Sequence, residues 1–291
     1  MTSSNREYAP LDPSLARLIR GPIAADHKYS RGVLGMVVGS AGYPGAALLV
    51  ASAALRTGIG MARLVSVDAV AELVLAARPE VVRGSVADRC DAWVLGCGVA
   101  VEPASAEASW IAAVSGAAHE VGVPMVIDAG ALQLVEIADF GPHAILTPHH
   151  GEAVRLLARY DVVATAADLE GDSIGAAQQL ANLTGSVVVL KGSRTVVAAP
   201  GDVFWRNHEA PAGLASAGTG DVLAGIIGAL AAAGYAHSRA NGDAPTVDPF
   251  EVARLGVWLH SQAAFELATE GTYLAGDMVE RMRSLIGRLA Q

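Results

Sequence analysis

Cysteine, aromatic residues and charged residues are all scarce in this sequence. Cys90 and Cys97 are the only cysteines among 291 residues, which is too few for a disulfide framework or a zinc site. Sparse cysteine is typical of a reducing compartment, so we expect a cytoplasmic protein. Aromatic residues make up 5% and charged residues 17% of the chain, against 52% hydrophobic residues. This balance excludes an intrinsically disordered chain.

Positive charge is in deficit. The 20 lysines and arginines are outnumbered by 29 aspartates and glutamates, which gives a net charge of −9. An acidic surface repels the phosphate backbone of nucleic acids, so we expect no nucleic-acid partner. A small anionic ligand is still compatible with this charge, because a few backbone N–H groups can bind an anion locally.

Long hydrophobic runs are also lacking. The longest cover residues 45–55 and 222–234, and both are shorter than the ~20 residues that a helix needs to cross a bilayer. The first residues, MTSSNREYAPLDPS, are polar and lack the apolar centre of a signal peptide. We therefore expect no membrane-spanning segment and no membrane partner.

Short apolar runs that end in glycine, proline or aspartate alternate with helical stretches along most of the chain. Such runs are typical of buried strands. The predicted strands are 32–40, 62–66, 92–95, 125–127 and 144–146, and helices are predicted at 44–58, 104–121 and 152–158. Alternation of this kind predicts an α/β fold with a mostly parallel central sheet and helices on both faces.

The two ends of the chain differ from this pattern. Residues 1–25 are predicted to form an N-terminal arm with a short helix at 14–19, followed by one catalytic domain over 26–291. Three strands follow one another closely within 186–206 and are expected to be linked as hairpins at Gly192 and Gly201. After them we predict a helix at 221–233, a polar loop at 234–249 and helices at 250–270 and 275–289.

The strongest local signal is ASAGTGDVLAGIIGAL (215–230), a glycine-rich turn that leads into an apolar helix. Gly218 and Gly220 free the backbone to take φ > 0 and to aim successive N–H groups at one point. With the helix dipole behind them, these donors would form an anion hole for a transferring phosphoryl group. Asp221 could take a proton from an attacking hydroxyl, although an aspartate here is also a good N-cap.

Two common nucleotide-binding motifs are missing. The chain has no GxxxxGK[ST] sequence and therefore no Walker A loop. The segment GSAGYPG (39–45) follows a predicted strand and opens a helix, but its glycine spacing is not that of a Rossmann fingerprint. The GTGD turn is thus the best indication of chemistry, and it favours phosphoryl transfer with Asp221 as general base.

Several blocks of the sequence together resemble the ADP-dependent NAD(P)H-hydrate dehydratases. They are GTGD, VVGSAGYPGAALLVASAALRTGIG (37–60), VIDAGAL (126–132), LTPHHGEA (146–153) and VVVLKGSRTVV (187–197). GTGD alone indicates only the ribokinase-like superfamily, whereas the TPHxGE and VxKGxxTV patterns, in this order, point to the dehydratase branch. The resemblance extends from Lys28 to Asp277 and implies a ribokinase-like fold.

The resemblance implies a repair reaction on NADH or NADPH that has taken up water across the nicotinamide ring. ADP would transfer its β-phosphate to the hydroxyl of the hydrate, and phosphate would then leave as the ring double bond re-forms, giving AMP and phosphate. Phosphorylation helps because phosphate is a far better leaving group than hydroxide. Asp221 would be the base, Gly218 and Gly220 would supply the anion hole, and Mg²⁺ would be the cofactor.

The resemblance also assigns binding roles. His149 would contact the hydrate, together with Ala46, Gly98 and Asp221. Gly220 and the KGSRT residues would contact the nucleotide, namely Lys191, Gly192, Ser193, Arg194 and Thr195. Glu152 would bind Mg²⁺ through water. The family implies a homotetramer and cooperation with a separate NAD(P)H-hydrate epimerase.

Each of these roles has an alternative. His150 could replace His149 as the ligand, Lys191 could simply be solvated, and Ala46 and Gly98 could be steric requirements. Glu152 could be a first-turn acid that complements the helix dipole. Asp128, at the end of a buried strand, is either a hydrogen-bond acceptor that closes a loop or a ligand.

Three departures from the family pattern affect the substrate side. Cys97 stands where the GPGLG turn has proline, Ala217 replaces the glycine before GTGD, and HKYSRG (27–32) replaces HKGxxG. None of them removes a catalytic group. Two other functions use a similar fold: an ATP-dependent hydroxyethylthiazole or hydroxymethylpyrimidine kinase with the same GTGD base, and an inactive nucleotide sensor, against which the intact GTGD argues.

Overall fold

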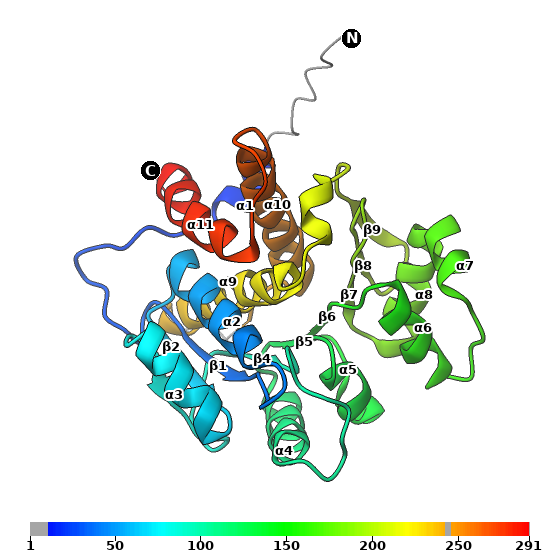
Figure 1. Ribbon diagram of the computed structural model, residues 1–291, viewed down its shortest axis with the longest axis horizontal. Coiled ribbons are helices and arrows are strands. Elements are labelled where there is room, and N and C mark those ends of the chain that lie inside the picture. Colours follow the sequence, from blue (N-terminus) through cyan, green and yellow to red (C-terminus); the bar gives the residue numbers. More distant parts are fainter. Residues whose placement is uncertain (1–10, 242–245, 291) are drawn as a thin grey trace.

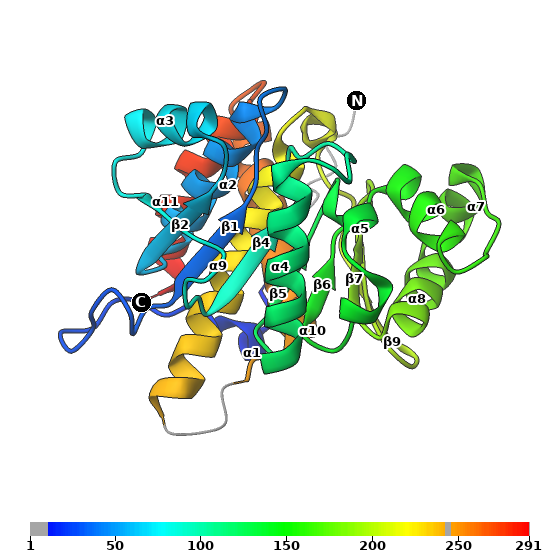
Figure 2. The same ribbon diagram turned by 90° about the horizontal axis from the view of Figure 1, so that it is seen from below.

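The computed structural model describes residues 11–241 and 246–290. Within them, one nine-stranded sheet runs through the centre in the order β3-β2-β1-β4-β5-β6-β7-β8-β9. Figure 2 shows the central strands β1, β4, β5, β6 and β7 side by side. The strands are β1 (Val33–Val37), β2 (Met61–Val65), β3 (Val82–Arg83), β4 (Ala92–Leu95), β5 (Met125–Ile127), β6 (Ala144–Leu146), β7 (Val187–Leu190), β8 (Val196–Ala199) and β9 (Val203–Arg206). Neighbours from β3 to β7 are parallel, and the last two pairs are antiparallel.

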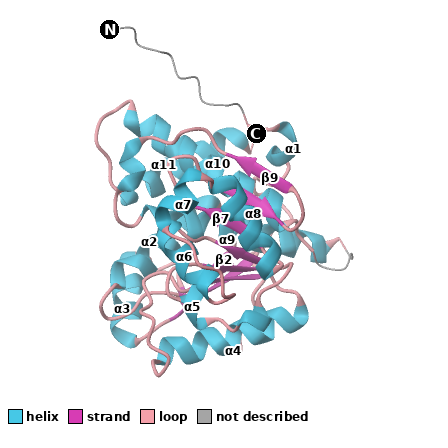
Figure 3. Ribbon diagram, turned by 90° about the vertical axis from the view of Figure 1, so that its right-hand side faces the viewer, coloured by secondary structure: helices cyan, strands magenta, loops and turns pink. Residues whose placement is uncertain are grey.

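Helices cover both faces of the sheet (Figures 1 and 3). One face packs against α2 (Pro44–Thr57), α9 (Thr219–Ala240), α10 (Pro249–Ala268) and α11 (Ala275–Leu289), with α1 (Pro13–Ala16) and α3 (Asp68–Ala77) joining this layer. The other packs against α4 (Ala106–Val121), α5 (Ala131–Leu134), α6 (His150–Ala158), α7 (Ala166–Gly171) and α8 (Ser173–Thr184). Short 3₁₀ turns occur at η1 (Ile137–Asp139) and η2 (Ala212–Ala215).

Alternation of side chains along β1 explains why the core has two halves. Leu34 and Met36 lie in the core beneath α2 and α9, whereas Val33 and Val37 lie in the opposite core. Every residue of β1 is buried, as expected for a parallel strand that is covered on both faces. Burial of one such side chain contributes about 1.5–3 kcal/mol.

The abundance of small residues allows α2 and α9 to approach each other closely. A Cβ atom on Gly225 of α9 would lie 2.5 Å from the carbonyl oxygen of Val50 in α2. Only glycine fits at such a distance. The contact fixes the helix that carries Asp221 against the helix that carries Ala46.

Most of the predicted elements are confirmed, including the strands at 92–95, 125–127 and 144–146 and the hairpins at the end of the sheet. The prediction of a loop from residue 234 is wrong for 234–240, because α9 continues to Ala240. Arg239 in its last turn forms an ion pair with Asp91, which is only 1% exposed and also accepts the Val33 N–H. Residues 242–245 of the predicted loop lie outside the described residues.

The length of α9 bears on the expectation that no segment of the chain spans a membrane. By length and composition alone, residues Thr219–Ala240 could cross a membrane. However, 72% of the apolar window is buried inside the protein. The helix packs between the sheet and the other helices of its layer, which is the environment of a central core helix.

The predicted N-terminal arm contributes to the same layer where it is described. Leu15 and Ile19 are buried in the core that also contains α9 and α10. The start of the arm, residues 1–10, lies outside the described residues.

Candidate active site

Residues from separate sequence blocks meet at the carboxyl ends of the central strands. Asp128 directly follows β5, His149 follows β6, and Lys191 follows β7. His149 and Lys191 are themselves paired by an isolated parallel bridge. In open α/β sheets this edge is where ligands bind, and the first turn of α9 lies beside it, since Lys191 approaches Gly220.

A cavity of about 750 Å³ opens between this edge, η2, α9 and α10. A volume in this range suits a ligand of nucleotide size. Its lining includes the predicted residues His149, Lys191, Gly192, Ser193, Thr195 and Gly220. Arg194 is not among the lining residues. Its guanidinium forms an exposed ion pair with Glu209 at 3.3 Å instead.

Part of the cavity wall comes from residues that the motifs did not indicate. Pro211 and Leu214 precede the glycine turn, and Val257 and His260 belong to α10. The His260 Nε2 atom lies 2.8 Å from the Thr219 carbonyl oxygen. Burial lowers the pKa of His260 to about 4, so the ring is neutral at neutral pH and its Nε2–H donates to that oxygen. A lone histidine in an apolar helix was the only sequence signal for this contact.

The turn before α9 has the geometry expected of an anion hole at one of its two glycines. Gly218 has φ +88°, and a Cβ atom there would lie 2.5 Å from the Leu49 Cδ1 atom. The Thr219 hydroxyl donates to the Leu214 and Ser216 carbonyls and closes the turn. Gly220, in contrast, has no positive φ and lies within the helix, which corrects the prediction for that residue. A Cβ atom on Gly220 would lie 3.5 Å from the Lys191 Nζ atom.

Asp221 does not cap the helix. Gly218 is the N-cap residue, and Asp221 lies in the first turn of α9 with no capping box between the two residues. Burial, with a smaller contribution from the charge of Asp128, raises the pKa of Asp221 to about 6 although the Lys191 ammonium acts in the opposite direction. A carboxylate with this pKa is ionised at neutral pH and is a stronger base than an ordinary aspartate.

Lys191 is held by two carboxylates rather than being simply solvated. Its Nζ atom lies 2.7 Å from Asp128 Oδ1 and 3.8 Å from Glu152 Oε2. Burial alone would lower the pKa of Lys191, but these carboxylates more than offset burial and raise it. The residue therefore presents a fixed positive charge beside Gly220, where a phosphate group would be attracted.

His149 has a structural role in addition to its place in the cavity. It is the N-cap of α6, where its Nδ1 atom accepts the Gly151 N–H at 3.0 Å, while Glu152 accepts the His149 N–H at 2.9 Å. Burial lowers the pKa of His149 in spite of the opposing charge of Glu152. His150 does not line the cavity. Its ring faces Gly192, and a Cβ atom placed on Gly192 would lie 3.1 Å from the His150 Cε1 atom.

Ala46 and Gly98, both predicted to contact the hydrate, lie against each other. Gly98 has φ +66°, and a Cβ atom on it would lie 2.5 Å from the Ala46 Cβ atom and 2.9 Å from the Tyr43 carbonyl. A side chain at position 98 would therefore collide with Ala46. Next to them, the buried Cys97 thiol donates to Asp128 Oδ2 at 3.4 Å, and burial raises its pKa well above the ordinary value.

Asp221 lies between these two regions. It does not line the large cavity, but one of its carboxylate oxygens lies within 4.8 Å of both Cys97 Sγ and an Asp128 carboxylate oxygen. Gly98, which follows Cys97 in the chain, lies against Ala46. Gly220, which precedes Asp221, lies close to Lys191. A base in this position can reach a hydroxyl on one side while the phosphate donor lies on the other.

The contacts of the same residues limit where a metal ion could bind. Both oxygens of Glu152 face His149, one at the backbone N–H and the other at 3.4 Å from Nε2, so direct coordination would break the helix cap. Contact with Mg²⁺ through water is compatible with that geometry, because a carboxylate has additional lone pairs. Cys97, Asp128 and Asp221 also cluster, but the Lys191 ammonium already occupies the Asp128 carboxylate, and we assign no metal to them.

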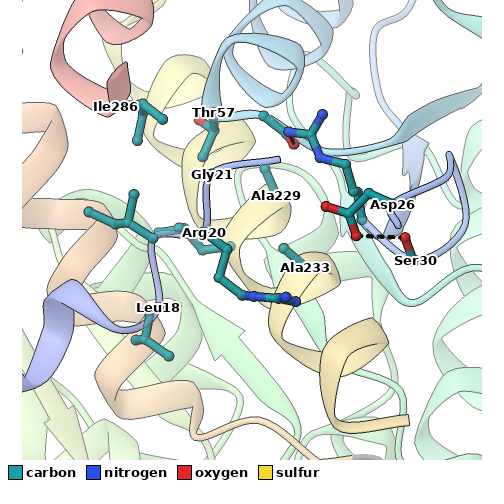
Figure 4. A pocket seen from close by; sticks show the side chains of 13 residues that line it. Leu18, Arg20, Gly21, Asp26, Ser30, Thr57, Ala229, Ala233 and Ile286 are labelled. Atoms are coloured by element: carbon teal, nitrogen blue, oxygen red, sulfur yellow. Dashed lines mark hydrogen bonds between the residues drawn. The ribbon is translucent and has the colours of Figure 1, made fainter. Parts of the chain in front are cut away.

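A second, much smaller crevice lies at the opposite edge of the sheet, under the N-terminal segment (Figure 4). It is lined by residues 18–21, Asp26, Ser30 and Arg31, together with the end of α2, the middle of α9 and Ile286 of α11. The Ser30 hydroxyl donates to Asp26 and closes one side of the loop. Its volume of about 30 Å³ holds one water molecule, which excludes it as a substrate site.

Comparison with known proteins agrees with this geometry. The sequence model of the family described as NAD(P)H-hydrate dehydratase matches residues 34–284. The chain is 36% identical to the ADP-dependent (S)-NAD(P)H-hydrate dehydratase of Neisseria meningitidis serogroup B, over 91% of its own length and 88% of that protein. It is 38% identical to the bifunctional NAD(P)H-hydrate repair enzyme Nnr of Mycobacterium tuberculosis over 75% of its length, and spans only 45% of that protein.

Solved structures show the same relationship. The structure is similar to the ADP/ATP-dependent NAD(P)H-hydrate dehydratase of Bacillus subtilis, co-crystallised with ATP/Mg²⁺, with a TM-score of 0.75 and 26% identity over 94% of this chain and 96% of that one. A ribokinase-like superfamily protein of Enterococcus faecalis shares the fold, with a TM-score of 0.77 and 23% identity over 95% and 94% of the two chains. The predicted fold and family are therefore confirmed, and the chain belongs to the NAD(P)H-hydrate dehydratase family.

Proposed function

We propose that the protein is an ADP-dependent (S)-NAD(P)H-hydrate dehydratase, a lyase that restores NADH or NADPH from the hydrated forms. The observation that carries the proposal is the placement of the uncapped Asp221 carboxylate between a nucleotide-sized cavity and the Ala46–Gly98 contact. Family membership supports the choice of substrates. The nucleotide would occupy the cavity beside Lys191, and the hydrate would reach Asp221 from the side of Gly98.

The reaction begins when Asp221 takes the proton of the hydrate hydroxyl, whose oxygen then bonds to the β-phosphorus of ADP. The bond from that phosphorus to the bridging oxygen breaks, and AMP leaves. Backbone N–H groups of the Gly218 turn and the Lys191 ammonium stabilise the charge on the transferring phosphoryl group. The lone pair of the ring nitrogen then expels phosphate, and loss of a proton from the neighbouring ring carbon restores the double bond.

Other features of the enzyme follow as part of the proposal. When bound, Mg²⁺ would neutralise charge on the phosphate oxygens, with Glu152 contacting it through water. We further propose a cytoplasmic homotetramer that acts with a separate NAD(P)H-hydrate epimerase, and one domain over residues 26–291. A monomer mass in light scattering at micromolar concentration would contradict the tetramer.

The test follows the fate of the phosphate. Purified protein is incubated with ADP, Mg²⁺ and NADH hydrate while absorbance of the reduced nicotinamide and free phosphate are recorded together. The dehydratase produces reduced nicotinamide, AMP and phosphate in equal amounts. A small-molecule kinase would instead leave phosphate on an alcohol such as hydroxyethylthiazole and release none. No response to the hydrate, or phosphorylated alcohol without free phosphate, would contradict the proposed function.

A further inference from the structure

Asp128 is the residue at which the ends of four neighbouring strands meet. Its Oδ1 atom accepts the Thr147 hydroxyl at 2.7 Å and the Lys191 ammonium at 2.7 Å, and its Oδ2 atom accepts the Cys97 thiol at 3.4 Å. These donors follow β6, β7 and β4, while Asp128 itself follows β5. Only 3% of the residue is exposed, so its direction is set by these contacts and not by solvent.

The backbone around Asp128 is fixed as firmly as its side chain. The Asp128 N–H donates to the Leu95 carbonyl at 3.0 Å, and the Ala131 N–H donates to the Asp128 carbonyl at 3.1 Å. Between them, Ala129 has φ +48°, a left-handed conformation that is rare for a residue with a Cβ atom. Such a conformation persists only where the surroundings enforce it, and it occurs most often at functional sites.

We propose that Asp128 is a positioning residue for phosphoryl transfer, which holds the Lys191 ammonium beside Gly220 and faces the Asp221 carboxylate with a fixed negative charge. The inference deepens the proposed function and rests on it. Asp128 needs no contact with either substrate in this role. It acts through Lys191, which binds the phosphate, and through Asp221, which accepts the proton.

The second part of the role depends on every charge that faces Asp221. Asp128 approaches it from the end of β5, Lys191 from the end of β7 and the Cys97 thiol from the end of β4, while His260 of α10 is neutral and bonded to Thr219. Burial raises the pKa of Asp221 most, Asp128 adds to the increase, and Lys191 opposes it. Loss of the Asp128 charge would therefore leave a weaker base that titrates at lower pH.

Asp128→Asn tests both parts, because it removes the charge and preserves the shape. We expect the Asp221 carboxyl, observed by ¹³C NMR and assigned with Asp221→Asn, to titrate at a pH lower by on the order of one unit. Binding of ADP measured by calorimetry should weaken about tenfold, the effect of losing one charge-assisted hydrogen bond to the phosphate from a Lys191 ammonium that Asp128 no longer holds in place. Thr147→Val is the matched control. It removes one hydrogen bond to the same carboxylate and no charge, so Asp221 should titrate as in the wild type.

Wild-type titration of Asp221 together with wild-type ADP affinity in Asp128→Asn would overturn the inference. If that variant does not fold, Lys191→Met tests the part of the role that acts through the cation: without the ammonium that Asp128 holds, ADP should bind about tenfold more weakly. Wild-type ADP affinity in Lys191→Met would refute the role. Neither measurement requires turnover. If the wild-type protein does not convert the hydrate, the proposed function is contradicted, but the role of Asp128 can still be tested by these measurements.

Discussion

At the scale of single residues, Asp221 has the two properties that a catalytic base needs. It is not used as a helix cap, and burial, followed by the charge of Asp128, raises its pKa to about 6. The carboxylate must be ionised to accept a proton. The rate should therefore fall as the pH decreases through about 6, and it should level off about one pH unit above that value.

Asp221→Asn should lower turnover by about 10²–10⁴-fold, the usual contribution of a positioned base. ADP binding and the melting temperature should stay close to those of the wild type, because the side chain makes no cap hydrogen bond. Steady-state rates across pH 5–8, with calorimetry for ADP, would check this. Near-normal activity in the variant would mean that another group accepts the proton.

His149 presents a different case, since its cavity position and its cap role must be separated. His149→Ala removes the ring and the cap of α6, which should cost about 1 kcal/mol of unfolding free energy. His149→Asn keeps a good N-cap without the imidazole. If the ring contacts the hydrate, KM for the hydrate should rise by a similar factor in both variants, while only His149→Ala loses stability in urea denaturation. Normal KM in His149→Asn would leave only the cap role.

The residue contacts at this site could be predicted from the sequence only in part. GTGD and KGSRT indicated Gly218, Asp221 and Lys191, because such motifs carry their chemistry within a few adjacent residues. The sequence left Asp128 undecided, because its partners depend on which strands are neighbours in the sheet. Arg194 was assigned to the nucleotide by its place in the motif, yet its side chain pairs with Glu209.

At the scale of elements, α9 connects the site to the core, and each of its ends can be tested. At the first end, Gly218→Val should nearly abolish turnover with little effect on the KM of the hydrate, because a β-branched residue resists φ +88° and its Cβ atom would meet Leu49. Gly276→Ala is a matched control in α11, with open space around the new Cβ atom. Equal activity of Gly218→Val and the control would contradict an anion hole at this turn.

At the other end of α9, Arg239 pairs with the buried Asp91. Asp91→Ala should destabilise the protein by about 3 kcal/mol, because it leaves the Arg239 charge and the Val33 N–H without their acceptor. The exposed Arg83–Asp68 pair offers a comparison, and Arg83→Ala should cost about 0–1 kcal/mol. Urea denaturation of both variants measures the difference. Similar values would show that the pair does not anchor the helix.

The Arg239–Asp91 pair shows why the sequence could predict some element boundaries and not others. Strands such as 92–95 and 144–146 are apolar runs with clear stops, and they appear where expected. The segment GYAHSRA (234–240) is polar and begins with glycine, which favoured a loop. It is helical because a partner 148 positions away, Asp91, fixes its last turn. The two residues of β3 carry no signal of their own and pair only because β2 lies beside them.

At the scale of the whole molecule, the cavity joins parts of the chain that are distant in sequence: the end of β7, the η2 segment, the start of α9 and the middle of α10. A nucleotide bound there would contact all of them and stabilise only the folded state. ADP at 100 times its Kd should add about 2.7 kcal/mol to the free energy of unfolding. The melting temperature of a chain of this size should then rise by roughly 5 °C.

Two variants decide whether this stabilisation comes from the cavity that we describe. Lys191→Met removes the cation held beside Gly220 and should abolish most of the increase at the same ADP concentration. Arg194→Ala should retain the full increase, because Arg194 lies outside the cavity wall and pairs with Glu209. The sequence motif alone would predict a loss in both. Thermal unfolding with and without ADP therefore separates the motif from the geometry, and an increase that survives in Lys191→Met would place the nucleotide elsewhere.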